Sequence, residues 1–168
     1  MNENISTAVF EEPASAASSR AIKTIVTGGL IVGVLDCLAA TISAGLKGVT
    51  FTQVWQYVAS GLLGETSSSY GWGSVFLGLL IHFFIAFSIT TIFYLASRRL
   101  HGLVQQPALW GPLYGITVYS VMGQIVVPLS RVAQGTPTLR GLLTGLFIHI
   151  FIIGLPIAFI TRQFSKSG

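Results

Sequence analysis

Four apolar stretches, each long enough to cross a lipid bilayer, constrain this chain more than any other feature. They run at about residues 24–46, 73–97, 109–130 and 141–161. Roughly 20 helical residues span a hydrocarbon core of about 30 Å. Backbone polar groups inside lipid must bond within their own segment, so each stretch is expected to form an α-helix. The sequence therefore predicts an all-α, polytopic membrane protein whose four transmembrane helices form a bundle.

Composition supports a lipid environment. Only 8% of the residues are charged, against about 25% in a typical soluble domain, and the mean hydropathy is +0.76. The expected partner is therefore the lipid bilayer. The 9 Lys and Arg residues are scattered between apolar segments, which argues against nucleic acid, because a nucleic-acid binder clusters its basic side chains on one face. A single cysteine, Cys37, excludes a disulfide within one chain.

The chain divides into a tail and one membrane domain. Residues 1–19 are polar, small and acidic, which is typical of a disordered tail, and residues 20–168 form the four-helix transmembrane domain. The longest connection contains apolar residues at helical spacing over about 51–63, after Thr50 or Thr52 as N-cap. We expect a short outer interfacial helix there, with Trp55 and Tyr57 at the level of the lipid headgroups. A helix that docks a partner is the alternative.

Loop charge predicts the orientation. Six basic residues flank the apolar stretches on one side, and three flank them on the other. The positive-inside rule then places both termini in the cytoplasm. The six are Arg20, Lys23, Arg98, Arg99, Arg162 and Lys166, and the three are Lys47, Arg131 and Arg140.

An internal repeat links the second and fourth stretches. Residues 78–85 read GLLIHFFI and residues 145–152 read GLFIHIFI. The chain is therefore interpreted as a duplicated helical hairpin. Because the two repeated helices run in the same direction, its pseudo-axis would lie along the membrane normal.

Small residues mark the faces on which the helices are expected to pack, because glycine lets helix backbones approach closely in lipid. The first and third stretches each carry a GxxxG pattern, and the second and fourth carry small residues in steps of four. The predicted packing residues are Gly29, Gly33, Gly78, Gly111, Gly115, Gly141 and Gly145.

Four polar residues inside the apolar stretches form the candidate site. Asp36, His82 and His149 fall near the membrane midplane, and Gln124 lies nearer the outer end. An ionisable side chain at this depth is costly, so it is a functional-site hypothesis by default. The simplest way to lower that cost is mutual hydrogen bonding. We therefore expect Asp36, His82 and His149 to converge, with Gln124 as a fourth member.

Several interpretations of this cluster remain open. It could be purely structural, with hydrogen bonds that hold the helices together. It could handle protons or cations, since histidine titrates near neutrality. It could ligate a b-type haem through His82 and His149, with Gly78 and Gly145 leaving room for the porphyrin. A Zn or Cu site is weaker, because only three ligands are present.

Enzyme chemistry of the soluble kind has little support. The chain contains no Walker loop, GxGxxG, GxSxG or HExxH motif. We therefore expect a structural or accessory membrane component rather than an enzyme, with the proton, cation or haem module as the alternative. A second copy of the chain or another membrane protein is the expected protein partner.

Six segments of the chain resemble those of a known family. The segments are ASGLLG (59–64), LGLLIHFFIA (77–86), YLASRR (94–99), WGPLYG (110–115), VVPLS (126–130) and HIFIIGLPIAF (149–159). With them the chain resembles a family of small, uncharacterised four-helix inner-membrane proteins of bacteria. The resemblance implies the four-helix topology and a bacterial inner membrane, and it supplies no catalytic residues.

Overall fold

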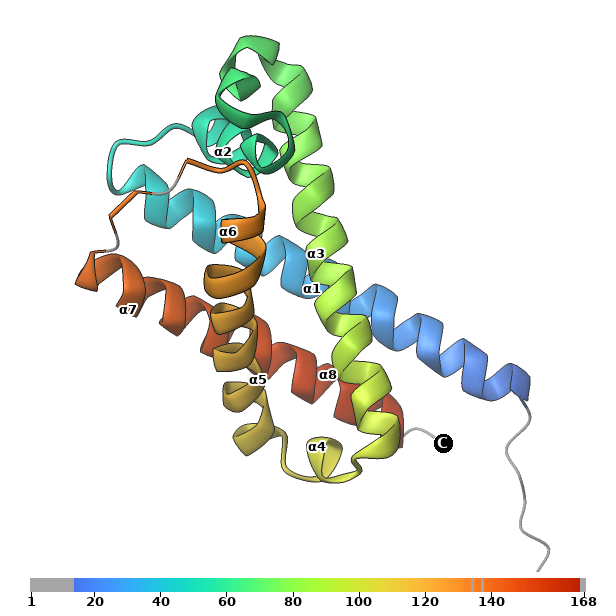
Figure 1. The fold of residues 1–168 in the computed structure, drawn as a ribbon. Helices are drawn as coiled ribbons and strands as arrows, with labels where there is room; N and C mark the ends of the chain where they lie inside the picture. The colour runs from blue at the N-terminus through green and yellow to red at the C-terminus, as the bar shows by residue number, and fades with distance from the viewer. Residues whose placement is uncertain (1–13, 134, 137, 167–168) are drawn as a thin grey trace, which may run out of the picture.

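The protein folds into four long helices and a few short ones (Figure 1). The computed structural model describes residues 14–133, 135–136 and 138–166. Within them, four helices are long and apolar enough to cross a membrane. They span Ala17–Gly45, Trp72–Arg99, Pro107–Leu129 and Leu139–Ser165. The predicted all-α, four-helix membrane fold is therefore confirmed, and the protein is a multi-pass membrane protein.

Two of the long helices are continuous and two are built from several segments. The continuous ones are α1 (Ala14–Gly45) and α3 (Trp72–Arg99). The third consists of α5 (Pro107–Val121), η2 (Met122–Val126) and α6 (Val127–Leu129). The fourth consists of α7 (Leu139–Ile148), η3 (His149–Gly154) and α8 (Leu155–Lys166). The short elements are α2 (Phe51–Leu63), the 3₁₀ helix η1 (Gly64–Tyr70) and α4 (Gly102–Gln105).

Helix α1 begins earlier than its apolar stretch. It starts at Ala14, so residues 14–19, which we expected in the tail, are helical. The rest of the expected tail, residues 1–13, lies outside the described residues. Small residues such as Ala and Ser dominate 14–19 and do not interrupt a helix that continues into the apolar stretch.

Pro128 and Pro156 explain why the third and fourth long helices are interrupted. Proline has no backbone N–H and its ring collides with the carbonyl four residues earlier. A wider π-helical turn precedes each of these two prolines. The N–H of Val127, just before Pro128, bonds the carbonyl of Met122, five residues back, and the N–H of Leu155, just before Pro156, bonds that of Ile150. These wide turns accommodate the proline without ending the helix.

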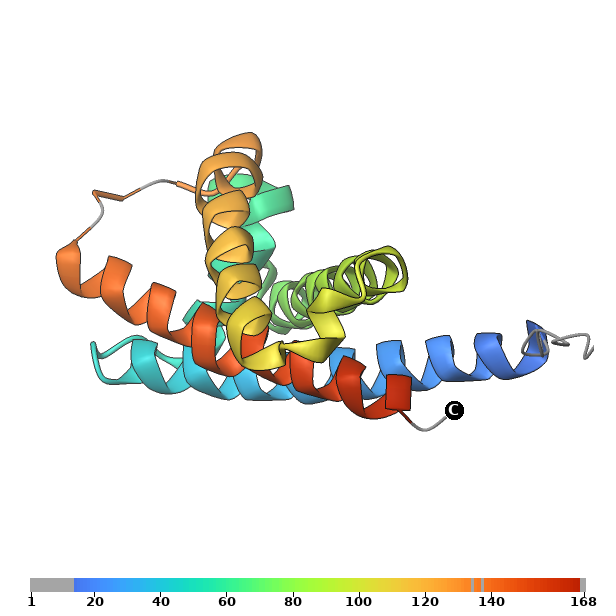
Figure 2. The same cartoon turned by 90° about the horizontal axis from the view of Figure 1, so that it is seen from below.

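Helix α1 packs against two of the other three long helices. It contacts α3 and also η3 and α8, while α5 packs against η3 and α8. Figure 2 shows α1 and the α7–α8 rod running side by side in opposite directions. We name the two ends of the bundle by their short helices, the α2 end and the α4 end. Helices α1 and α3 and the α7–α8 rod all pass between them.

Four of the predicted packing glycines lie close to a neighbouring helix. A Cβ on Gly33 would meet the ring of Phe83 at 2.6 Å, and one on Gly111 would meet the Cα of Leu155 at 2.9 Å. Gly29 likewise faces the ring of Phe87, and Gly115 faces the backbone of His149. Close approach of this kind contributes van der Waals packing, one of the sources of helix association in lipid.

Gly141 is different. A Cβ there would meet only the hydroxyl of Thr138, which caps the same helix through the N–H of Gly141. Its small size serves the start of α7, and it does not mediate a contact between helices.

Helix α2 has the predicted bounds but a deeper position than expected. Its N-cap is Thr50, whose hydroxyl accepts from the N–H of Gln53 while the Gln53 side chain accepts from the N–H of Thr50. It packs on α3. Trp55 is 1% exposed, whereas Tyr57 is 55% exposed. Trp55 is therefore packed against protein and does not present its ring to lipid headgroups, because α3 covers this part of the apolar face of α2.

Lipid-facing surface is evident along α3. Phe76, Leu80 and Phe84 follow one another at four-residue spacing and are 68%, 68% and 71% exposed. An exposed apolar stripe of this kind suits a helix with lipid on one side. The buried side chains of Phe93, Ile153 and Ile157 belong to the core on the opposite side.

Candidate functional site

Three of the predicted site residues line the same two cavities. Asp36 lies on α1, His82 on α3, and His149 is the first residue of the π-helical turn η3. The larger cavity, which we call the vestibule, has a volume of about 340 Å³ and extends to Lys47 and Gly141 at the α2 end. The smaller one, the apolar chamber, measures about 200 Å³ and is otherwise lined by aliphatic side chains and Met122.

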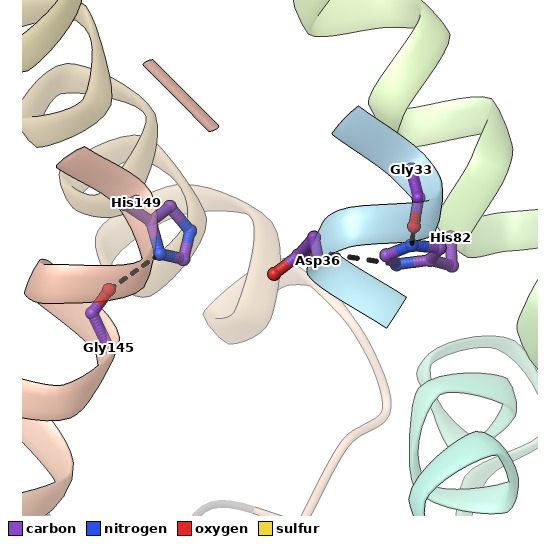
Figure 3. A network of polar contacts seen from close by, with 5 residues as sticks. All are labelled: Gly33, Asp36, His82, Gly145 and His149. Carbon is purple, nitrogen blue, oxygen red and sulfur yellow. Dashed lines mark hydrogen bonds and ion pairs between the residues drawn. The ribbon is translucent and has the colours of Figure 1, made fainter. Parts of the chain in front are cut away.

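Asp36 and His82 form a close pair. The Oδ2 atom of Asp36 lies 3.8 Å from Nδ1 of His82, and the two side chains are 24% and 11% exposed. This distance is within ion-pair range and longer than a hydrogen bond. The other ring nitrogen of His82, Nε2, lies 2.8 Å from the carbonyl oxygen of Gly33 on α1 (Figure 3). Both contacts join α3 to α1.

The Gly33 carbonyl determines where the proton of a neutral His82 resides. A carbonyl oxygen only accepts hydrogen bonds, so Nε2 must carry the hydrogen. Nδ1 then presents a lone pair to Asp36 unless a second proton is bound. The contact is favourable when one further proton lies on either the carboxyl group or the imidazole. Without that proton, a carboxylate faces a lone pair at low exposure, which is unfavourable. The pair is thus arranged to hold one proton between its two members.

His149 lies on the opposite side of Asp36 from His82 in Figure 3. Its Nδ1 is 2.8 Å from the carbonyl oxygen of Gly145, one turn earlier in the same helix. By the same reasoning Nδ1 carries the hydrogen, and Nε2 remains available as an acceptor. Asp36 therefore lies between two imidazoles, each of which is oriented by a backbone carbonyl.

Each histidine is also covered by an aromatic side chain. Trp55 of α2 meets His82 with ring centroids 5.0 Å apart at 68°, and Tyr119 of α5 meets His149 at 5.2 Å and 68°. The same two residues cover the glycines one turn earlier. Gly78 faces the backbone carbonyl of Trp55, and a Cβ on Gly145 would come within 2.8 Å of the Tyr119 ring. The repeated Gly-and-His pattern thus has a matching three-dimensional environment.

Trp55 and Tyr119 were not identified from the sequence as site residues. Trp55 is separated from His82 by the whole η1 segment, and an apolar helical pattern does not reveal its distant neighbour. The indole N–H of Trp55 is buried with no hydrogen-bond acceptor among the described residues.

Gln124 does not join the cluster. It lies in η2, its side chain is exposed, and it lines neither cavity. The π-helical turn before Pro128 changes which face of this helix each residue occupies, so the direction inferred for a regular helix does not apply there.

The metal interpretation has no geometric support in the described residues. No group of three or more His, Cys, Asp and Glu side chains there could hold a metal ion. A haem with two histidine ligands would need a free ring nitrogen on each, and Nδ1 of His82 and Nε2 of His149 remain. The haem interpretation also relied on space beside Gly78 and Gly145, and the Trp55 backbone and the Tyr119 ring occupy that space. The packing therefore does not favour it.

Towards the α4 end, most buried hydroxyls of the described residues bond within their own helix. Thr24, Thr90 and Thr161 are at most 1% exposed. Each donates to the carbonyl four residues earlier in its own helix. The hydroxyl of Tyr114 on α5 instead donates to the carbonyl of Ile89 on α3. Among the described residues, neither these threonines nor Tyr114 links the cluster to the α4 end through a chain of side chains.

Comparison with protein-family models, with curated proteins and with solved structures finds no match to this chain.

Proposed function

We propose that this protein is a proton-binding component of a bacterial inner membrane, with Asp36 and His82 as the binding pair and His149 as the group that exchanges protons with them. The observation that carries the proposal is the 3.8 Å contact between Asp36 and an imidazole whose other nitrogen must already carry a hydrogen. Such a pair is stable with one added proton and strained without it.

Access supports proton exchange from one side. The vestibule connects the cluster with Lys47 and Ser43 near the end of α1. We infer that both termini are cytoplasmic, from the basic residues at the α4 end, so the vestibule would open to the outer side of the membrane. The proposed site then senses or buffers outside protons, because the described side chains form no continuous relay from it to the α4 end.

A structural role is the second candidate. The hydrogen bond between His82 and the Gly33 carbonyl joins α3 to α1, and a contact of this type contributes about 1 kcal/mol in a membrane. If Asp36 stays protonated at every accessible pH, the cluster only stabilises the contact between the helices.

We also propose that the chain belongs with the small four-helix bacterial inner-membrane proteins it resembles, on the basis of its six shared segments.

Counting protons separates the two candidates. The protein is reconstituted in nanodiscs of neutral lipid, and protons bound after small pH steps are measured with an indicator dye for the wild type and for Asp36→Asn. The amide keeps the side-chain shape and cannot titrate. We expect the variant to bind about one proton fewer per chain between roughly pH 4 and 8, a range that covers the ordinary titration of carboxyl and imidazole groups. Identical proton-binding curves for the wild type and Asp36→Asn would contradict the proposal and favour the structural role.

A measurement of proton flux tests whether the protein conducts protons across the membrane. In liposomes with an imposed pH gradient, wild type and Asp36→Asn are both expected to show only background leakage. Proton flux that requires Asp36 would replace the binding proposal with a conducting one.

A further inference from the structure

A second polar cavity lies at the α4 end, away from the Asp36 cluster. It has a volume of about 260 Å³, and Arg20, Arg98 and His101 are among the residues that line it. We call it the basic pocket. Arg20 precedes Asp36 by 16 residues on α1, which corresponds to about 24 Å along the helix. The two sites are therefore separate.

The charge of the basic pocket has one sign. Its cationic and titratable groups come from three places, namely α1, the last turn of α3 and the turn before α4. No lining residue is acidic. The only acidic residues in the described part of the chain are Asp36 and Glu65, and neither lines this pocket. Such a site favours an anion.

The buried polar side chains of the basic pocket already donate hydrogen bonds to backbone carbonyls of their own helices. Thr24 and Ser97 are 1% and 5% exposed, and their hydroxyls donate to the carbonyls of Arg20 and Tyr94. They can therefore accept but not donate further. Recognition of an anion falls mainly to Arg98 and His101, both of which are exposed at the rim. A guanidinium donates two parallel hydrogen bonds, a geometry that matches a phosphate.

The rest of the lining is apolar. Phe164 and Val104 are half-buried, and Tyr94 is mostly buried. An anion with an apolar body fits this combination better than a small hydrated ion does. The location agrees, because the pocket lies where the last turns of α3 and α8 meet α1, and the basic ends of spanning helices are expected at headgroup depth.

We propose that the basic pocket binds the phosphate group of an anionic phospholipid, with Arg98 as the main clamp and the apolar wall along the start of the lipid chains. Arg98 in the last turn of α3 also has a simpler role, since a cation there stabilises the helix dipole. Arg99 shares that role but does not line the pocket. The two arginines therefore form a matched pair for a test.

The test is lipid binding measured by native mass spectrometry of the full chain in detergent. The probes are phosphatidylglycerol, phosphatidylcholine as the zwitterionic comparison, and inorganic phosphate. We expect Arg98→Gln to weaken phosphatidylglycerol binding about tenfold, the size of one strong charge-assisted hydrogen-bond pair. Arg99→Gln should weaken it less than about threefold, and Asp36→Asn should leave it unchanged. Arg98→Lys, which keeps the charge without the fork, should fall between wild type and Arg98→Gln.

Several results would overturn the proposal. Equal weakening by Arg98→Gln and Arg99→Gln would show a diffuse surface attraction. Equal binding of the two lipids would remove the anionic specificity. Binding of inorganic phosphate as tightly as phosphatidylglycerol would make this a site for a free anion. Because Asp36 plays no part in these measurements, failure here is distinguishable from failure of the proton-binding proposal.

Discussion

At the residue scale, the polar cluster shows how much a backbone carbonyl can determine. His82 and His149 occupy equivalent positions in the repeated sequence, yet their backbone partners differ. His82 bonds across to Gly33 on α1, while His149 bonds one turn back to Gly145. The sequence indicated that Asp36 and the histidines are buried at similar depth. It could not indicate which nitrogen meets which carbonyl, because that depends on the crossing of two helices.

Replacement of the histidines should reveal this difference. His82→Ala removes a bond between helices and leaves the Gly33 carbonyl and Asp36 without their partner. We expect a loss of roughly 1–3 kcal/mol in the free energy of unfolding, the usual penalty for unsatisfied buried groups. His149→Ala removes a bond within one helix and should lower the free energy of unfolding by less. Unfolding of the purified variants by denaturant in detergent micelles measures both, and a larger effect for His149→Ala would contradict the assignment.

At the element scale, the long apolar helices follow directly from their composition, whereas the position of α2 does not. Its start at Thr50 and its length were predictable from capping and periodicity. Its burial against α3 depends on Gly78, which lets the Trp55 backbone approach. Likewise Pro128 and Pro156 indicate disturbed helices in the sequence, but the choice of a π-helical turn depends on packing around them.

A pair of glycines on α3 tests the docking of α2. A Cβ at Gly78 would collide with the carbonyl of Trp55, while nothing lies within 4 Å of one at Gly73. Gly78→Ala should therefore push α2 away and destabilise the protein by about 1–3 kcal/mol. Gly73→Ala should be neutral or slightly stabilising, because alanine favours helix. Thermal unfolding followed by tryptophan fluorescence compares them. Equal midpoints for the two variants would mean that α2 is not held by this contact.

At the scale of the whole molecule, the structure divides into two chemically different ends. The vestibule opens at the α2 end, and the basic pocket lies at the α4 end. Hydropathy alone predicted the four crossings, and loop charge predicted the direction. The pairing of α1 with α3 and of α5 with η3 and α8 could not be derived from the sequence, because apolar helices carry little information about their neighbours.

Reporter fusions test the direction. With the α4 end in the cytoplasm, an alkaline phosphatase fusion after residue 168 should be inactive, since that enzyme folds only outside the cytoplasm. A fusion within the η1 segment, near Ser68, should be active. The reverse pattern would place the vestibule on the cytoplasmic side and the basic pocket outside.

The central claim is that Asp36 exchanges a proton with its surroundings, and infrared difference spectroscopy tests it most directly. Spectra of the reconstituted protein are recorded at acidic and at neutral pH, for the wild type and for Asp36→Asn. We expect a carboxyl C=O band that changes with pH in the wild type and is missing from the Asp36→Asn difference spectrum. Difference spectra that are the same for both proteins would contradict it, because Asp36 would then hold one protonation state throughout.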